Sequence, residues 1–192
     1  MDALTITLVL AGGTVVLIGF YVLVAYNRFI AQRNLIAESW KQIDVELQRR
    51  FDLIPNLIET VKGYAAHERQ VLENVTAARG AALAQAQAGV GPAGRQDTEN
   101  AFSRAIGGLF AVAENYPNLR ASENFAQLQG ELAHTEDRIA AGRRFYNGNV
   151  RAFNTRVEAV PSNIVAGIFS FSQFDYFEIE DPQARQPVHV RF

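Results

Sequence analysis

The chain has 192 residues, of which 48% are hydrophobic and 20% are charged, and its formal net charge is -2. This near-neutral charge provides no general attraction to nucleic acid, so we expect no nucleic-acid partner. The sequence contains no cysteine, which excludes disulfide bonds, cysteine-ligated zinc and thiol catalysis.

The first predicted element is a membrane-spanning helix over residues 1–27. No charged residue occurs between Ala3 and Asn27, and about 20 apolar residues allow a helix to cross the hydrocarbon core of a bilayer. A cleaved signal peptide is the competing interpretation. It would carry a basic leader, a shorter apolar core and a small-residue cleavage site, and this segment has none of these features.

The basic residues that flank this segment lie on one side of it. Asp2 precedes the segment, whereas Arg28, Arg33 and Lys41 follow it closely. The positive-inside rule therefore predicts a single-pass protein whose remaining residues lie in the cytoplasm.

The chain after the anchor begins with a long amphipathic pattern, in which apolar residues recur mostly three or four positions apart. The positions on this face are Ile36, Trp40, Ile43, Leu47, Phe51, Ile54, Ile58, Val61, Ala65, Leu72 and Val75. The pattern predicts one near-continuous helix from the membrane to about Ala88. Pro55 and Gly63 are its weak points, since a proline inside a helix removes a backbone hydrogen bond and glycine has a low helix propensity.

Two more helices are predicted further along the chain. Residues 89–94 read as a turn, and amphipathic helices follow at roughly 97–113 and from Pro117 to about Val160. No alternating pattern typical of a strand occurs in this region. We therefore predict an all-α protein, in which the transmembrane helix continues into an elongated antiparallel helical bundle over residues 28–168, with coiled-coil-like packing.

Polar side chains of the bundle would face one another if its first and last helices pack antiparallel. With facing residue numbers that sum to about 196, Arg50 would lie near Tyr146 and Asn147, and Pro55 near Gly142. The candidate site then comprises Arg49, Arg50, Asp52, Asn56, Arg143, Arg144, Tyr146, Asn147 and Asn154. Because half-buried charges need partners, these residues form either a polar network that fixes helix register or a groove for an acidic group or a partner helix.

Residues 169–192 form a predicted extended tail that is rich in aromatic residues. The candidate docking residues of this tail are Phe169, Phe171, Phe174, Tyr176 and Phe177. One interpretation is that the tail covers the apolar face of the bundle. The other is that it docks onto another subunit or partner, because aromatic side chains often anchor interfaces.

The sequence contains no recognisable catalytic or metal-binding motif. His67, His134 and His189 lie outside the spacings of zinc motifs, and neither a phosphate-binding glycine loop nor a nucleophile elbow occurs. We therefore expect a protein that is not an enzyme, without catalytic residues, bound metal or cofactor.

Four strings carry a resemblance to a known family. They are AYNRFIAQRN at 25–34, ESWKQIDVELQRRFDLIPNLIETVKGYAAHE at 38–68, AENYPNLRASENFAQLQGELAHTEDRIAAGRRFYNGNVRAFNTRV at 113–157, and PSNIVAGIFSF at 161–171. With these strings the chain closely resembles the LemA family of bacterial membrane proteins. The resemblance implies a single-pass protein of the bacterial inner membrane with a mostly helical body, and it implies no defined reaction.

Together, the resemblance and the missing catalytic motifs lead us to expect a membrane-anchored, non-enzymatic scaffold or accessory protein. It would contact lipid through its anchor, and it would form a homo-oligomer or organise membrane protein partners. Two alternatives stay open, namely a membrane-shaping protein and an adaptor that regulates a membrane enzyme such as a protease.

Overall fold

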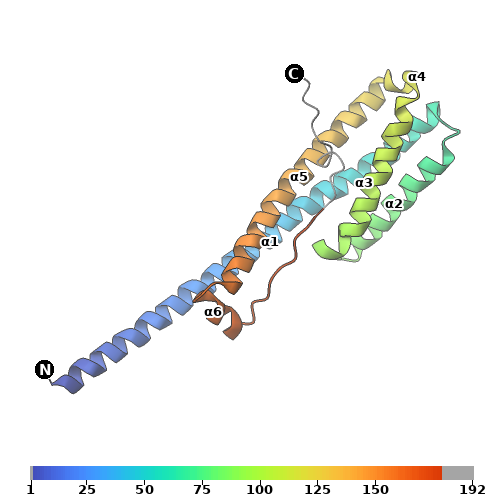
Figure 1. The fold of residues 1–192 in the computed structure, drawn as a ribbon. Coiled ribbons are helices and arrows are strands. Elements are labelled where there is room, and N and C mark those ends of the chain that lie inside the picture. Colours follow the sequence, from blue (N-terminus) through green and yellow to red (C-terminus); the bar gives the residue numbers. More distant parts are fainter. Residues whose placement is uncertain (1, 179–192) are drawn as a thin grey trace, which may run out of the picture. The chain divides into compact units, whose positions relative to one another are not determined.

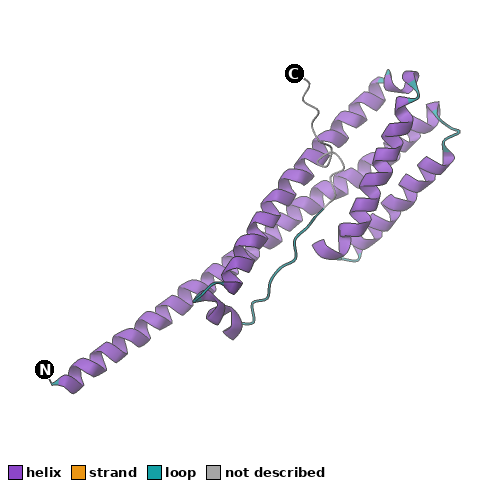
Figure 2. Cartoon of the chain, in the orientation of Figure 1, coloured by secondary structure: helices purple, strands orange, loops and turns teal. Residues whose placement is uncertain are grey.

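The computed structural model describes residues 2–178, and these residues form helices joined by turns and a short extended segment, without any strand (Figure 1, Figure 2). The helices are α1 (Ala3–Tyr64), α2 (Arg69–Gln87), α3 (Pro92–Glu114), α4 (Pro117–Arg120), α5 (Glu123–Glu158) and α6 (Ser162–Ile168). The prediction of an all-α fold that begins with a long apolar helix is confirmed.

The chain divides into two compact units, and α1 and α5 each contribute residues to both. Within the described residues, unit 1 consists of residues 2–39 and 145–174, and unit 2 consists of residues 40–144 and 175–178. Each unit has its own set of buried side chains.

The first part of α1, in unit 1, is long and apolar enough to cross a membrane. Large side chains between Leu4 and Leu23 are mostly exposed, and only 6% of the most apolar window is buried inside the chain. An apolar surface of this length is not covered by the protein itself, which is typical of a helix that lies in lipid and not of a core helix.

The prediction of one helix that continues to Ala88 is wrong, because α1 ends at Tyr64 and the chain turns at residues 65–68. α2 then packs alongside α3 (Figure 1), and Val75 and Ala82 become buried in unit 2. The turn follows Gly63 and coincides with the string AHERQ, which has no large apolar residue to extend the buried face.

Turn residues set the remaining boundaries. Gly89 has a φ of +68°, a conformation that glycine adopts at low cost, and Pro92 occupies the first turn of α3. α3 therefore begins earlier than predicted. Pro117 starts a helix as predicted, but that helix is the short α4, and α5 begins separately at Glu123.

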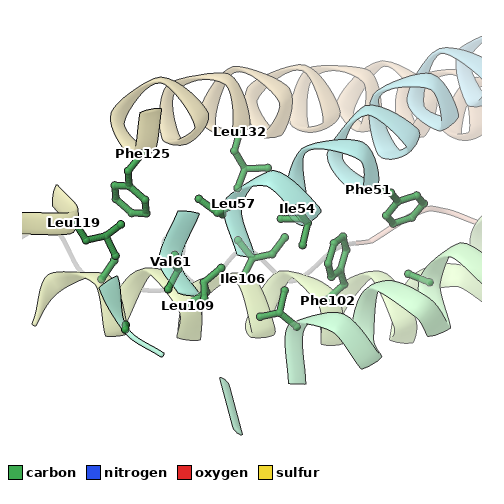
Figure 3. Close-up of a cluster of buried hydrophobic side chains, with 14 residues drawn as sticks. Phe51, Ile54, Leu57, Val61, Phe102, Ile106, Leu109, Leu119, Phe125 and Leu132 are labelled. Atoms are coloured by element: carbon green, nitrogen blue, oxygen red, sulfur yellow. The ribbon is translucent and has the colours of Figure 1, made fainter. Parts of the chain in front are cut away.

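The core of unit 2 is formed mainly by aliphatic side chains from α1, α2, α3 and α5, with Leu119 from α4 (Figure 3). Its buried members are Phe51, Ile54, Leu57, Val61, Ala65, Val75, Ala82, Phe102, Ile106, Leu109, Ala113, Leu119, Phe125 and Leu132. The rings of Phe51 and Phe102 pack with their centroids 5.5 Å apart. The buried face of α1 passes through Leu57 and not through Ile58, which is only partly buried.

Helices α1 and α5 pack antiparallel in unit 2, but the predicted register is wrong. A methyl group at Gly142 would lie 3.0 Å from Ile43 Cγ1, and Arg50 pairs with Glu136. Facing residue numbers thus sum to 185–186, and Pro55 does not lie opposite Gly142. Because about 11 residues make three helical turns, a shift of this size keeps the same apolar faces together, so periodicity does not distinguish the two registers.

The core of unit 1 contains a cluster of aromatic rings. Phe29 of α1 lies edge-on to Phe153 of α5, with centroids 5.5 Å apart, and it stacks on Phe171, which follows α6, at 4.7 Å. Phe174 also contacts Phe153, at 5.0 Å. The segment after α6 therefore completes this core.

Candidate functional site

Among the residues that the structure describes, the buried charged side chains are Arg50, Arg95 and Glu99, each at most 2% exposed. All of them belong to unit 2, where they contact one another and a few partners on α1, α3 and α5. We refer to the full set as the arginine network, which comprises Asp44, Arg50, Arg95, Glu99, Ser103 and Glu136.

Arg50 connects α1 to two other helices. Its Nη1 donates hydrogen bonds to Glu136 Oε1 on α5, at 2.9 Å, and to Ser103 Oγ on α3, at 3.1 Å. Its Nη2 donates to the carboxylate of Glu99 on α3. One guanidinium group thus fixes the relative positions of three helix segments through charge-assisted hydrogen bonds, which are roughly twice as strong as neutral ones.

Glu99 is shared between two arginines. Arg95, one turn earlier on α3, donates from Nη2 to Glu99 Oε1 at 2.9 Å, while the other carboxylate oxygen of Glu99 accepts from Arg50. Arg95 also donates from Nη1 to Asp44 on α1. The network therefore links α1 and α3 twice, through Arg50 and through Arg95.

Both guanidinium groups lie over aromatic rings. The Arg50 Cζ atom is 5.1 Å from the centroid of Phe102, and the Arg95 Cζ atom is 5.5 Å from that of Trp40. Cation–π contacts of this kind contribute about 1–2 kcal/mol when the cation is removed from water. They provide a favourable interaction on the side of each guanidinium that no carboxylate contacts.

The network is not fully satisfied. The Nε atom of each arginine is buried without an acceptor, and two of the three acidic partners, Asp44 and Glu136, remain 52% and 42% exposed. Burying charges in this way costs solvation energy that pairing only partly offsets. We therefore interpret the network as a device that specifies which residues face one another, a role for which buried charges are well suited.

Among the described residues, the arginine network consists of ion pairs and hydrogen bonds between side chains. The arrangement pairs no nucleophile with a general base, and residues 2–178 contain no group of three or more acidic or histidine side chains that could hold a metal ion. His67 and His134 are exposed on the surface, and His189 lies outside the described residues.

Of the nine side chains predicted to form a site, Arg50 joins the arginine network, and its partners are not the predicted Tyr146 and Asn147. The remaining positions divide into the exposed Arg49, Asp52, Asn56 and Arg144, the half-buried Arg143 and Asn147, and the buried Tyr146 and Asn154. Asp52 accepts a hydrogen bond from Gln48, one turn away on the same helix, at 2.9 Å.

Asn154 has a separate role in unit 1. Its Nδ2 donates to the Phe174 carbonyl and its Oδ1 accepts from the Phe174 amide, both at 2.9 Å. The side chain therefore pairs with the backbone of the tail much as a neighbouring strand would, and it holds Phe174 against α5.

The aromatic residues of the tail contact helices of their own chain. In unit 1, Phe169 lies 4.8 Å from Tyr26, measured between centroids, although it remains 44% exposed. In unit 2, Phe177 is buried at 5.0 Å from Trp40, and the Tyr176 carbonyl accepts a hydrogen bond from Gln96. Docking of the tail onto another subunit stays a prediction.

The apolar spacing on α3 contains a signal for the burial of Arg95 and Glu99, which the sequence analysis missed. On α3 the buried positions are 95, 99, 102, 106, 109 and 113, which alternate in steps of four and three. Extending the apolar pattern backward from Phe102 places both charges on the buried face. Charged residues at such positions indicate a buried ionic contact.

Known proteins resemble the chain over most of its length. The family model described as "LemA family" matches residues 39–192. Magnetosome protein MamQ 1 of Paramagnetospirillum magneticum is 28% identical, over 86% of this chain and 69% of the relative. Magnetosome protein MamQ of Magnetospirillum gryphiswaldense is 27% identical, over 95% and 76%.

Protein LemA of Metamycoplasma hominis is 23% identical, over 83% of this chain and 75% of the relative. None of these names states a reaction. Since the family match covers the body of the helical fold and its tail, this chain belongs to the LemA family.

Proposed function

We propose that the chain is a membrane-anchored, non-enzymatic scaffold of the bacterial inner membrane, which self-associates or organises membrane partners from the cytoplasmic side. The observation that carries the proposal is the composition of α1. The same helix supplies an exposed apolar segment between Leu4 and Leu23 and, after it, the buried residues Ile43, Leu47 and Phe51. One helix thus serves both as an anchor and as a core element of the body.

The arginine network supports a structural role for the body. Each of its buried charges is paired with another side chain of the same chain, an arrangement suited to holding helices in register. The exposed polar face of α1, with Arg49, Asp52 and Asn56, is available for contacts with other proteins. Exposed polar faces of this kind suit reversible association.

Self-association is tested with single cysteines, because the chain has none of its own. We expect an Asn56→Cys variant to form a crosslinked homodimer in native membranes, and we expect the purified chain in mild detergent to have a mass above that of one copy. Ala133→Cys places a second test cysteine at an exposed position on α5. A strictly monomeric protein without crosslinked adducts at either position contradicts the scaffold proposal.

The direction of insertion is tested with a membrane-impermeant maleimide on spheroplasts. We expect Asp2→Cys to react in intact spheroplasts. Wild-type Val45 is 67% exposed, and we expect Val45→Cys to react only after lysis. The opposite result places the body outside the cytoplasm.

The crosslinking experiment also separates the alternatives. An adduct with a membrane enzyme, in place of a second copy, favours an adaptor that regulates this enzyme. Deformation of vesicles by the purified chain, at protein densities where an anchor-only peptide leaves them unchanged, favours a membrane-shaping protein.

A further inference from the structure

Unit 1 exposes a second apolar surface, separate from the anchor, around the short helix α6. Val160 is 80% exposed, Ile164 60%, Ile168 65% and Phe169 44%. We refer to these four residues as the elbow. Scattered apolar residues are normal on a soluble surface, but large ones that are neighbours in the fold indicate a contact with a partner or with lipid.

The elbow lies within a stretch of unusual composition. No charged residue occurs between Glu158 and Asp175. Val165 and Ala166 point into unit 1 and are buried, while Ile164 and Ile168, one turn apart on α6, face outward. α6 therefore presents apolar side chains on both its inner and its outer face, which is not expected of a helix that faces water.

Contacts within unit 1 place the elbow at the end of the anchor. The ring of Phe169 lies 4.8 Å from that of Tyr26, and Phe171 lies 5.8 Å from it. The exposed apolar part of α1, from Leu4 to Leu23, has a length of about 30 Å at 1.5 Å per residue, which equals the thickness of the hydrocarbon core. With that part in the bilayer, Tyr26 lies at the headgroup level, and Phe169 of the elbow packs against its ring.

The backbone at the C-terminal end of α6 is internally hydrogen-bonded, as a segment at the edge of the hydrocarbon requires. The Phe169 amide donates to the Val165 carbonyl at 3.1 Å, and the Phe171 amide donates to the Ala166 carbonyl at 2.9 Å. Ser170, with a φ of +55°, adopts the left-handed conformation that closes the end of α6. The chain thus leaves the helix without exposing unpaired amides around this turn.

Beyond the anchor, unit 1 has a small excess of basic residues. It contains four arginines and two acidic residues there, whereas the whole chain has a net charge of -2. The arginines are Arg28, Arg33, Arg151 and Arg156, and the acidic residues are Glu38 and Glu158. This excess of two positive charges in the unit that contains the elbow suits the anionic headgroups of the cytoplasmic leaflet.

We propose that the elbow inserts into the boundary between headgroups and acyl chains, in the leaflet where α1 leaves the membrane. The occupant of this apolar surface is lipid, and α6 acts as a second, interfacial attachment next to the transmembrane helix. This inference rests on the anchoring proposed above. The inference goes beyond anchoring because an inserted elbow would hold unit 1 against the bilayer surface.

The test measures the depth of single fluorescent labels on the full chain reconstituted in liposomes. The positions are Val16→Cys in the anchor, Ile168→Cys in the elbow and Val45→Cys in unit 2, which replace wild-type residues that are 70%, 65% and 67% exposed. We expect the Ile168 label to lose most of its fluorescence to a nitroxide attached near the lipid headgroup. The Val16 label should respond mainly to a mid-bilayer nitroxide, and the Val45 label only to aqueous iodide.

Each outcome has a defined meaning. If Val16 is quenched from within the bilayer while Ile168 behaves like Val45, the elbow proposal is overturned and the anchoring stands. If Val16 is reached by iodide, both fail. If the Ile168 label is protected from iodide but is not quenched by any lipid nitroxide, a protein covers the elbow and the lipid assignment is wrong.

A second variant checks that the label itself does not drive insertion. A charge within the interface is unfavourable, so Ile164→Glu in the Ile168→Cys background should shift the label toward iodide and away from the headgroup nitroxide. Val45→Glu in the same background, at an exposed position in unit 2, should leave the label unchanged. An Ile168 label that keeps its depth despite Ile164→Glu contradicts insertion of α6.

Discussion

Unit 1 and unit 2 stabilise their helices by different interactions. Unit 2 combines an aliphatic core with the arginine network, in which Glu99 is shared by Arg50 and Arg95. Unit 1 packs aromatic rings on Phe153, and the buried polar side chains that the structure describes there, Ser39 and Asn154, are neutral. Among the described residues, the unit that contains the anchor has no buried charge, and the other unit pairs its buried charges with one another.

This difference separates two ways of specifying a fold. Guanidinium–carboxylate pairs are directional, and an unpaired partner in the interior is costly. Aromatic rings gain most of their energy from buried area and tolerate several tilts and offsets. Unit 2 should therefore respond sharply to the loss of one group, and unit 1 more gradually and locally.

The largest effect is expected from Glu99→Ala. This substitution leaves two buried guanidinium groups without their common acceptor, and breaking a buried ion pair from one side costs about 3–5 kcal/mol of the free energy of unfolding. Guanidinium unfolding of the chain in mild detergent, followed by helical circular dichroism, measures this loss. Glu114→Ala, at an exposed position on the same helix, should change stability by less than about 0.5 kcal/mol.

A loss below about 1 kcal/mol for Glu99→Ala would show that water replaces the missing carboxylate. The combined variant Arg50→Met, Arg95→Met and Glu99→Leu then separates stability from specificity. Apolar replacement of a complete buried ion triad is often neutral or stabilising, so we expect its stability to stay near that of the wild type.

Phe153→Ala should be the most damaging change in unit 1. The side chain is buried and touches Phe29, Phe171 and Phe174, and truncation of a buried phenylalanine costs about 3 kcal/mol or more. Hydrogen exchange should accelerate in residues 145–174, with a smaller change in unit 2. Phe145→Ala, on the same helix but 52% exposed, provides the control and should have little effect, whereas equal acceleration in both units would contradict a locally acting aromatic core.

Asn154→Ala should have a moderate and local effect. It removes both hydrogen bonds to Phe174, which together contribute about 1–3 kcal/mol. We expect the Phe174 amide to exchange faster with solvent, while the backbone amides of the arginine-network residues keep their protection from exchange. The exposed Asn34→Ala is the matched substitution, and an unchanged Phe174 amide in the Asn154 variant would mean that ring packing alone holds the tail.

The smallest effect concerns alkaline pH. Partial burial, with a hydrogen bond to Glu68 and the negative charge of that residue, raises the pKa of Tyr116 above its usual 10.0. A raised pKa in the folded state contributes stability that is complete below pH 10.0 and is lost as the pH rises through the folded-state value.

Tyr116→Phe removes this contribution. The stability difference between wild type and Tyr116→Phe should therefore be constant in neutral solution and should shrink above about pH 10. Tyr64→Phe, at a 48% exposed tyrosine, is the control for general titration of phenols. A stability difference between wild type and Tyr116→Phe that grows with pH would contradict a raised pKa of Tyr116 in the folded state.

Local patterns predicted much of this fold. The uncharged run between Ala3 and Asn27 indicated the anchor, and the apolar steps from Ile36 to Val61 predicted most of α1. The turn after Tyr64 was not predicted, because Ala65 in the turn and Val75 on α2 continue the apolar spacing of α1. An apolar pattern records which face is buried and not whether one helix or two carry it.

The candidate site was only partly predictable, with Arg50 recognised and its partners Glu99, Ser103 and Glu136 missed. Apolar spacing repeats with each turn and stays nearly unchanged when one helix slides by about three turns, so the sequence alone specifies helices, their buried faces and the apolar anchor. The choice among registers depends on contacts between residues distant in sequence. A hydrogen-bonded ion pair requires its nitrogen and oxygen atoms within about 4 Å of each other, and three-dimensional packing therefore selects which charges meet.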